Sequence, residues 1–206
     1  AVDDVKAAQW YQLAAKQKFA DAQYNLGIMY ENGKGFAEDN VAAVKWYRLA
    51  ARQKLTEAQY NLGVMYENGK GVAQDNAEAL KWYHLAADEG YAKAQNSLGN
   101  MYYAGKGVAE DVAEAVRWYQ LAAEQGADAQ YNLGVMYENG KGVAEDDAEA
   151  VNWYRLAAEQ GHADAQKKLG NMYYAGKGVA QDVGEAVKWY RLAAEQGHAK
   201  AQNSLG

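Results

Sequence analysis

The sequence predicts an all-α repeat protein, built from pairs of antiparallel helices that recur about every 36 residues. The first observation is the spacing of the tryptophans, which lie 36, 36, 36, 35 and 36 residues apart. The second is the similarity of the copies, because residues 58–72 and 129–143 share the letters AQYNLGVMYENGKGV. A period of this length is typical of a helical solenoid. The tryptophans are Trp10, Trp46, Trp82, Trp118, Trp153 and Trp189.

The repeat frame divides the chain into five full repeats between two partial ones, and we treat residues 1–206 as a single solenoid. The chain begins with a lone second helix and stops within a further first helix, so both ends of the stack are expected to be uncapped. Because an uncapped end exposes the core between repeats, we expect head-to-tail self-association between copies. The predicted units are 1–19, 20–55, 56–91, 92–126, 127–162, 163–198 and 199–206.

The first helix of each repeat is predicted from an apolar stripe. Ala22, Leu26, Met29 and Tyr30 fall at i, i+4, i+7 and i+8, which is helical spacing. Gly27 lies inside this helix, where glycine costs roughly 1 kcal/mol relative to alanine. Its recurrence indicates a neighbouring helix that is too close for a β-carbon. The equivalent glycines are Gly63, Gly99, Gly134 and Gly170.

Glycine, and not proline, is predicted to end these helices, because the chain has 21 glycines and no proline. A glycine after the last helical residue supplies the left-handed conformation that closes a helix. The glycines in this position are Gly33, Gly69, Gly105, Gly140 and Gly176.

The second helix of each repeat is predicted to begin at an aspartate N-cap. Four repeats place a glutamate three residues after this aspartate, which resembles a capping box. These recurring carboxylate pairs are therefore interpreted as helix starts and not as acid and base catalysts. Ala79, Trp82, Tyr83 and Ala86 follow as a buried stripe. The pairs are Asp75 with Glu78, Asp111 with Glu114, Asp146 with Glu149, and Asp182 with Glu185.

A glycine-rich turn with a central lysine links the two helices. A phosphate-binding loop of similar composition follows a strand and occurs once, whereas this turn follows a helix and occurs in every full repeat. The lysine also lies near the last carbonyl groups of the first helix, where the helix dipole favours a positive charge. We interpret the turn as structural. Its lysines are Lys34, Lys70, Lys106, Lys141 and Lys177.

Composition and charge narrow the function classes. No apolar run approaches the roughly 20 residues that cross a bilayer, so no membrane insertion is expected. The net charge of -6 argues against a nucleic-acid partner, and the absence of cysteine excludes thiolate metal sites. The serines and histidines are too few and too scattered for a catalytic centre, so we expect no enzyme, no metal and no cofactor. They are Ser97, Ser204, His84, His162 and His198.

These motifs resemble those of the Sel-one-like repeat family, a relative of the tetratricopeptide repeat. The pattern is A-x-A-x-x-x-L-G-x-x-Y-x-x-G-x-G-V-x-x-D, followed by E-A-x-x-W-Y-x-x-A-A-x-x-G. The resemblance covers essentially the whole chain. It implies a right-handed superhelix of antiparallel helix pairs whose first helices line a concave surface. It also implies an adaptor that binds proteins or peptides, in bacteria often in the envelope or at the host interface.

A row of tyrosines on the first helices is the predicted ligand-binding face. Positions equivalent to 24, 28 and 31 share one side of the helix, and this side varies between repeats while the rest hardly changes. Exposed aromatic rings beside amide side chains suit peptide recognition. The alternative, that these tyrosines only pack against the neighbouring first helix, stays open. The predicted binding residues are Tyr24, Asn25, Ile28, Glu31, Tyr60, Asn61, Val64, Glu67, Asn96, Asn100, Tyr103, Tyr131, Asn132, Val135, Glu138, Lys167, Asn171 and Tyr174.

We therefore expect a non-catalytic scaffold that binds a protein or peptide on its first helices. An RNA-binding repeat would need a basic groove, yet Glu31, Glu67 and Glu138 oppose Lys167 and Lys168 on this side. A consensus-like or engineered scaffold without a ligand is the alternative, because the copies are nearly identical.

One turn is irregular. Residues 124–130 read EQGADAQ where other repeats read EQGHADAQ, so the equivalent of His162 is missing after Gly126. This deletion predicts a changed angle between the third and fourth repeats, and a tolerated loop deletion is the alternative.

Overall fold

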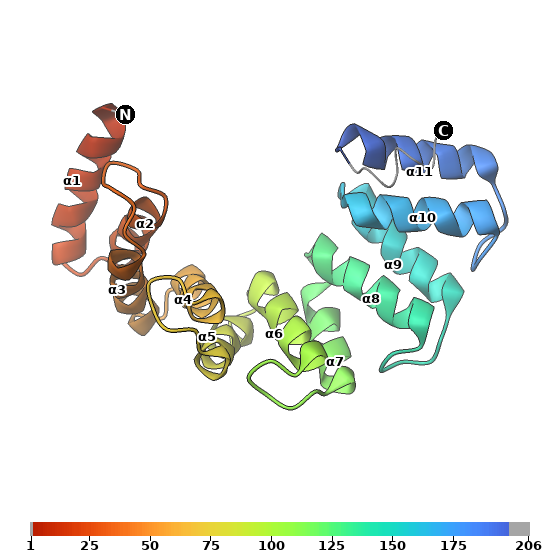
Figure 1. The fold of residues 1–206 in the computed structure, drawn as a ribbon, viewed down its shortest axis with the longest axis horizontal. Helices are drawn as coiled ribbons and strands as arrows, with labels where there is room; N and C mark the ends of the chain where they lie inside the picture. Colours follow the sequence, from red (N-terminus) through yellow and green to blue (C-terminus); the bar gives the residue numbers. More distant parts are fainter. Residues whose placement is uncertain (1, 198–206) are drawn as a thin grey trace. The chain divides into compact units, whose positions relative to one another are not determined.

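The structure is a computed structural model that describes residues 2–197, and every regular element within this range is an α-helix (Figure 1). The partial helix predicted at 199–206, and with it the open C-terminal end, lies outside the described residues. The helices are α1 (Val2–Lys16), α2 (Ala20–Glu31), α3 (Asn40–Arg52), α4 (Thr56–Asn68), α5 (Asn76–Asp88), α6 (Ala92–Ala104), α7 (Val112–Ala122), α8 (Ala127–Asn139), α9 (Asp147–Glu159), α10 (Ala163–Ala175) and α11 (Val183–Glu195).

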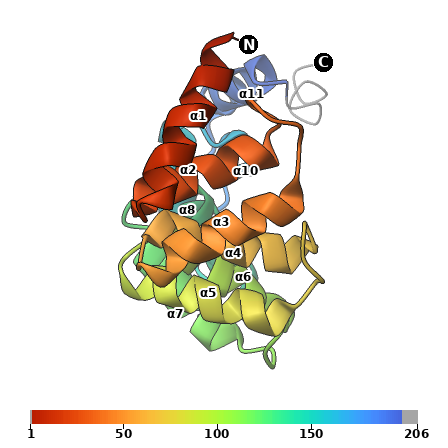
Figure 2. The same ribbon diagram turned by 90° about the vertical axis from the view of Figure 1, so that its left-hand side faces the viewer.

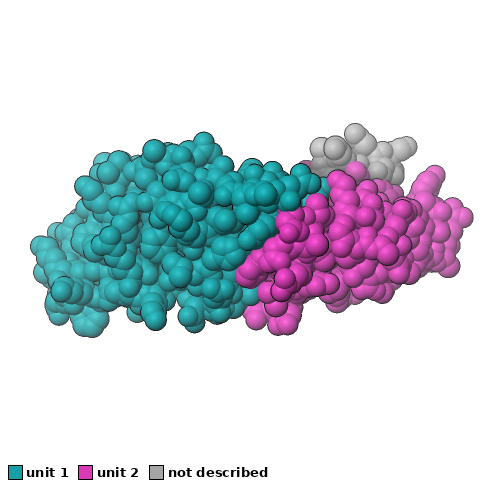
Figure 3. Space-filling model, turned by 90° about the horizontal axis from the view of Figure 1, so that it is seen from below, with its two compact units in different colours: residues 1–110 teal, residues 111–206 magenta. Residues whose placement is uncertain are grey.

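The helices fall into two compact units, residues 1–110 and residues 111–206, which are described separately (Figure 3). In the first unit each helix from α1 to α6 contacts the next one (Figure 2). The same holds from α7 to α11 in the second unit. The even-numbered helices are the first helices of the repeats and the odd-numbered ones are the second helices. The predicted all-α fold of paired antiparallel helices is confirmed.

Aspartate side chains cap the second helices, as the sequence predicts. Oδ1 of Asp75 accepts a hydrogen bond from the backbone N–H of Glu78 at 2.9 Å, and Asp111, Asp146 and Asp182 make the same contact. Asp39 also caps its helix, although no glutamate follows it at the third position. The cap therefore depends on the aspartate alone.

The glycines inside four of the first helices, Gly27, Gly63, Gly134 and Gly170, each lie against the ring of a buried tyrosine. A β-carbon added to Gly63 would lie 2.6 Å from the ring of Tyr83, and Gly134 is as close to Tyr154. These tyrosines are fully buried between the two helices of their repeat. The close contact that the sequence predicts is confirmed, and it lets the ring lie flat against the helix backbone.

Both glycines of the G-x-G turn have positive φ angles, and the second one joins neighbouring repeats. Gly71 has a φ of 66° and lies against the backbone of Asn40, at the start of the second helix one repeat earlier. Gly107 lies in the same way against Asn76, where an added β-carbon would be 2.5 Å from the carbonyl oxygen. A side chain at this position would separate the two repeats.

The core consists mainly of alanine, leucine, methionine and tyrosine, with tryptophan at the junctions between repeats. Ala79, Tyr83 and Ala86 are fully buried, as predicted. Trp82 is half-buried and packs against the cluster formed by α3 of the preceding repeat and α4 of its own. Trp10, on the first helix of the chain, is 72% exposed.

Two of the second helices are followed by a left-handed lysine in place of a glycine. Lys18 after α1 and Lys54 after α3 have φ angles of 66° and 65°, in the left-handed region that glycines such as Gly90 occupy in later repeats. Glycine therefore does not end these two helices. A residue with a β-carbon pays roughly 1 kcal/mol or more for this conformation.

The shortened turn is accommodated locally. α7 ends at Ala122 and is two residues shorter than α9 or α11. Gly126 has a φ of −110° and serves as the N-cap of α8, whereas Gly161 takes a φ of 87° in the full-length turn. The deletion therefore shortens the preceding helix.

Candidate ligand-binding face

In the first unit the predicted tyrosine row consists of Tyr24 on α2, Tyr60 on α4 and Tyr103 on α6, and Tyr103 is half-buried. The rings of Tyr24 and Tyr60 each lie against the buried tyrosine of their own repeat, with centroids 5.9 Å apart for Tyr24 and Tyr47 and 5.7 Å apart for Tyr60 and Tyr83. Tyr60 also contacts the ring of Tyr91, at 5.3 Å. Tyr24 and Tyr60 are half-buried as well, so one part of each ring is fixed by packing and the other remains accessible.

In the second unit Tyr131 on α8 has the same surroundings. Its ring lies 5.8 Å from that of Tyr154 and stacks on His162 at 4.7 Å with an interplanar angle of 17°. His162 is fixed in turn because its Nδ1 accepts a hydrogen bond from the backbone N–H of Ala165 at 3.1 Å. Tyr174 differs, since it is 58% exposed.

Part of the row also packs against the core at the junction of two repeats. Tyr24 and Ile28 contact a buried cluster formed by α3 of their own repeat and α4 of the next, and Tyr131 and Val135 contact the equivalent cluster of α9 and α10 in the second unit. These four residues therefore do not lie wholly on the side away from the core. The packing interpretation accounts for part of each side chain, and ligand binding by the accessible part stays a prediction.

The buried tyrosines of four repeats each donate a hydrogen bond to a side chain of this face. The acceptor is a glutamate in three repeats and Asn171 in the repeat that contains Tyr174. At the positions equivalent to 28 and 31, each full repeat carries either an aliphatic residue and a glutamate, or an asparagine and a tyrosine. The distances are 2.6 Å from Tyr47 to Glu31, 2.7 Å from Tyr83 to Glu67, 2.5 Å from Tyr154 to Glu138 and 2.8 Å from Tyr190 to Asn171.

These hydrogen bonds keep the tyrosines protonated. Burial, together with the neighbouring glutamate, raises the pKa of Tyr47, Tyr83 and Tyr154 well above its ordinary value of 10.0. Their hydroxyl groups are therefore hydrogen-bond donors at neutral pH, with no capacity to act as general bases. Their role is to hold the acidic side chains of the face in place.

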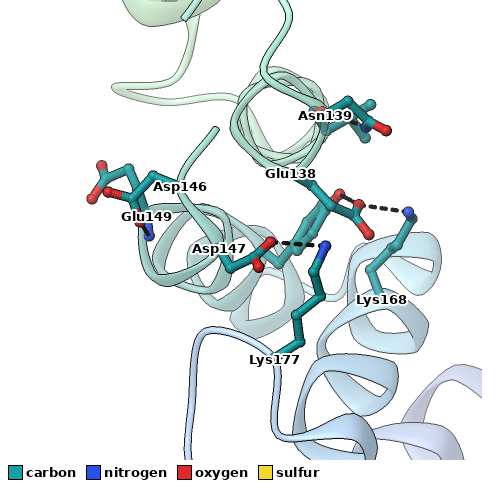
Figure 4. A network of polar contacts seen from close by, with 9 residues as sticks. Glu138, Asn139, Asp146, Asp147, Glu149, Lys168 and Lys177 are labelled. Atoms are coloured by element: carbon teal, nitrogen blue, oxygen red, sulfur yellow. Dashed lines mark hydrogen bonds and ion pairs between the residues drawn. The ribbon is translucent and has the colours of Figure 1, made fainter. Parts of the chain in front are cut away.

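Glu138 is the centre of a polar network in the second unit (Figure 4). Its Oε2 accepts hydrogen bonds from Tyr154 and from Nζ of Lys168 on the next first helix, the latter at 2.6 Å. Lys177, in the following turn, pairs with Asp147 at 2.9 Å. Burial would raise the pKa of Glu138, but the hydrogen bonds from Lys168 and Tyr154 outweigh it and hold the pKa below its ordinary value.

The predicted asparagines already have partners. Nδ2 of Asn25 donates to the backbone carbonyl of Asp21 at 2.8 Å. The Asn61 amide lies beside the hydroxyl groups of Tyr24 and Tyr47, where it acts to lower their pKa. A ligand backbone that binds Asn25 would have to compete with its bond to Asp21.

A buried glutamine in each repeat was missed by the sequence interpretation. Nε2 of Gln166 donates to the carbonyl oxygen of Ala158 in the preceding repeat at 3.1 Å. Its Oε1 accepts from Gln196 at 2.9 Å. The signal was present, because the pair alanine–glutamine recurs near the start of every first helix, as in Ala22-Gln23 and Ala165-Gln166. Such a fixed polar residue in a buried stripe indicates a hydrogen bond that the fold requires.

Metal and membrane sites were also sought. Within residues 2–197, no three His, Cys, Asp or Glu side chains gather in an arrangement suited to a metal ion. No helix in the described range combines the length and the apolar character needed to cross a membrane.

The family model of the Sel1 repeat matches residues 1–19, 20–55, 56–91, 92–126, 127–162 and 163–198. The chain belongs to the Sel1 repeat family. Sel1 repeat proteins are generally non-enzymatic scaffolds and commonly mediate protein interactions. The resemblance seen in the sequence motifs is thereby confirmed.

Two solved Sel1 repeat structures are similar over most of the chain. One is c5321, a protective antigen of uropathogenic Escherichia coli strains with an SLR fold, at 44% identity and a TM-score of 0.91 over 96% of this chain. The chain spans only 42% of that protein. A Sel1 repeat protein from Oxalobacter formigenes is 37% identical, with a TM-score of 0.86 over 92% of this chain and 76% of its own. No curated protein sequence matches the chain.

Proposed function

We propose that this Sel1 repeat chain is a non-catalytic scaffold that binds a protein or peptide on the face formed by its first helices. One observation carries the proposal: tyrosines recur at one register on α2, α4 and α8, and each is half-buried on a fixed aromatic partner. Aromatic rings that are held in place supply contact area at a low entropic cost.

The face would be preorganised for binding. The core tyrosines fix Glu31 and Glu67 through their hydroxyl groups, and Gly63 fixes the position of the ring beneath Tyr60. Because these side chains need no reordering, the entropy lost on binding would come mainly from the ligand.

Selectivity would come from the residues that differ between repeats. The first unit places aliphatic and acidic side chains beside the row, such as Val64 and Glu67. The last full repeat places Asn171 and Tyr174 there, with Lys167. A ligand on α2 and α4 would therefore meet acidic subsites, whereas a ligand on α10 would meet amide, tyrosine and lysine side chains.

The test compares two pairs of substitutions. The immobilised chain is incubated with a bacterial lysate and envelope extract, and captured proteins are identified by mass spectrometry and then measured in purified form by calorimetry. Tyr60→Ala with Tyr131→Ala should abolish capture. Leu85→Ala with Leu156→Ala, on exposed positions of the second helices, should leave it unchanged.

Circular dichroism confirms that each variant is folded. A partner held equally by the tyrosine variant would show that the first-helix face is not the binding surface. Capture of no partner by the unmodified chain would favour a scaffold without a ligand, with the tyrosines serving only in packing.

A further inference from the structure

The second helices carry an exposed leucine in every repeat. Leu49 on α3 is 41% exposed, Leu85 on α5 is 47% exposed, and Leu156 and Leu192 in the second unit are 45% and 43% exposed. Each follows the repeat tryptophan by three residues, which places the two side chains on one side of the helix. This surface lies on the second helices and is separate from the tyrosine row.

Between α1 and α3 this surface is hollowed into a depression of about 470 Å³. Ala15, Trp46 and Leu49 form its apolar part. Trp46 is half-buried, because it also packs against the cluster formed by Ala15, Ala22 and Leu26. The indole is thus held firmly while part of it remains accessible.

The rim of this depression is cationic. Lys16, Lys18 and Arg52 line it together with Gln23 and Gln53, and no acidic side chain is among its lining residues. The three cations are exposed, and none of them forms an ion pair within residues 2–197. A second, smaller hollow beside it is lined by Lys45, Arg48, Leu49 and Arg52.

The backbone of Lys18 has an unfavourable conformation. Its φ angle is 66°, a left-handed conformation that glycine adopts at the same position in later repeats. Residues kept in such conformations cluster at functional sites. Here the strained backbone places a lysine on the rim of the depression.

The equivalent position in the second unit, between α9 and α11, allows a comparison within the chain. Between α9 and α11 the tryptophan and leucine recur as Trp189 and Leu192, but Glu159 and Glu195 replace Lys16 and Arg52. Gly161 replaces Lys18. The apolar pair is therefore a property of the repeat, whereas the cationic rim is specific to the first unit of a chain whose net charge is -6.

We propose that the depression between α1 and α3 docks an acidic segment of a partner protein that carries a leucine or an aromatic anchor. The anchor inserts beside Trp46 and Leu49, and its flanking Asp or Glu side chains pair with Lys16, Lys18 and Arg52. The positive charge of the rim indicates an acidic partner. The apolar pair cannot indicate the partner by itself, because it recurs as Trp189 and Leu192 beside Glu159 and Glu195. This site is independent of the tyrosine face.

The test uses fluorescein-labelled peptides and the whole chain. The probe is a short synthetic peptide with one phenylalanine and one leucine flanked by Glu and Asp. One matched peptide has serine in place of the apolar residues, and another has lysine in place of the acids. Binding is measured by fluorescence anisotropy at low ionic strength, and the indole N–H signal of Trp46, assigned with Trp46→Phe, is followed by NMR.

The probe should bind and shift the Trp46 signal, and both matched peptides should bind about tenfold more weakly or not at all. The combined substitutions Lys16→Glu, Lys18→Glu and Arg52→Glu should reduce affinity by about tenfold or more. Lys34→Glu, Lys70→Glu and Lys93→Glu change the net charge equally at exposed lysines elsewhere in the first unit and should leave affinity nearly unchanged. Leu49→Ala tests the anchor without altering charge.

If both charge-reversed variants lost affinity for the probe equally, the loss would be due to net charge alone, and the proposal would be overturned. If the serine peptide bound as tightly as the probe, the apolar anchor would make no contribution, and the proposal would be overturned as well. Binding of vesicles with anionic lipids but not of the probe would assign the surface to a membrane. Dimerisation that depends on Lys16, Lys18 and Arg52, without peptide binding, would assign it to a second copy of the chain.

Discussion

Lys168 and Glu138 lie thirty residues apart and join two consecutive first helices, with Nζ and Oε2 at 2.6 Å. The same oxygen accepts a hydrogen bond from the hydroxyl group of Tyr154. One carboxylate therefore connects the two helices of its own repeat with the next repeat. This acidic group of the face is therefore a structural element as well as a possible contact for a ligand.

Glu138→Gln should lower stability at neutral pH and weaken its pH dependence. Because the pKa of Glu138 is depressed in the folded chain, its contribution is complete above the unfolded pKa, about 4.3. That contribution is lost as pH falls through the lower folded pKa. The loss at pH 7 should be about 1–2 kcal/mol, measured by urea denaturation between pH 7 and pH 3.

Glu31→Gln is the matched control for this substitution. Glu31 accepts the hydroxyl of Tyr47 in the same way, but Asn61 occupies the place of Lys168. Its stability profile should follow that of the unmodified chain more closely in acid. If the profile of Glu138→Gln runs parallel to that of the unmodified chain, the lysine does not act through this carboxylate.

Gly63→Ala should destabilise the chain even though alanine favours helices. The added β-carbon would lie 2.6 Å from the ring of Tyr83, which is fully buried and cannot move away freely. Overpacking of this kind costs about 1–3 kcal/mol, against a helix gain of roughly 1 kcal/mol. Thermal denaturation should show a lower melting temperature.

Gly184→Ala is the control for this substitution. Gly184 is exposed on α11, and an added β-carbon would meet only the side chain of Asp182. The equivalent positions of earlier repeats are Ala77, Ala113 and Ala148. This variant should be neutral or more stable, and equal destabilisation by both variants would mean that contact with the tyrosine is not the cause.

Lys54→Gly should stabilise the first unit by about 1 kcal/mol, because glycine adopts the observed φ of 65° without strain. Gly90→Lys, at the equivalent turn of the next repeat, should cost a similar amount although space is available there. Chemical denaturation of the two variants measures both changes. Shifts of the same sign would show that backbone strain does not control these turns.

Asp146→Ala should lower stability by about 1 kcal/mol, the usual effect of removing an N-cap. Its neighbour Asp147 provides the comparison, since it does not cap the helix and forms an ion pair with Lys177 in which the side chains are 27% and 43% exposed. Asp147→Ala should cost less, because an ion pair that solvent partly screens contributes little. An equal cost for both variants, measured by thermal unfolding, would show that the cap at Asp146 is not the stronger interaction.

Features that depend on local chemistry could be predicted from the sequence. Asp75 and Gly69 follow rules for the start and end of a helix, and those rules need no knowledge of the neighbours. Gly63 was correctly interpreted as a close contact because a mid-helix glycine is unfavourable unless packing requires it.

The remaining features depend on contacts between distant parts of the chain. The hydrogen bond from Gln196 to Gln166 spans thirty residues, and no local pattern distinguishes a buried glutamine from an exposed one. The face residues were placed by helical periodicity alone. Periodicity did not reveal that the side of α2 carrying Tyr24 would also meet the core formed by α3 and α4.

The turn glycine that lies against the preceding repeat also bears on how such arrays grow. Gly71 contacts the backbone of Asn40, and Gly178 contacts that of Asp147 in the same way. One partner supplies only peptide atoms and the other supplies only the lack of a side chain, so the identity of the residue at the contacted position is unconstrained. A whole repeat copied in frame carries both halves of this junction, and unequal recombination can therefore lengthen or shorten the array without compensating substitutions in its neighbours.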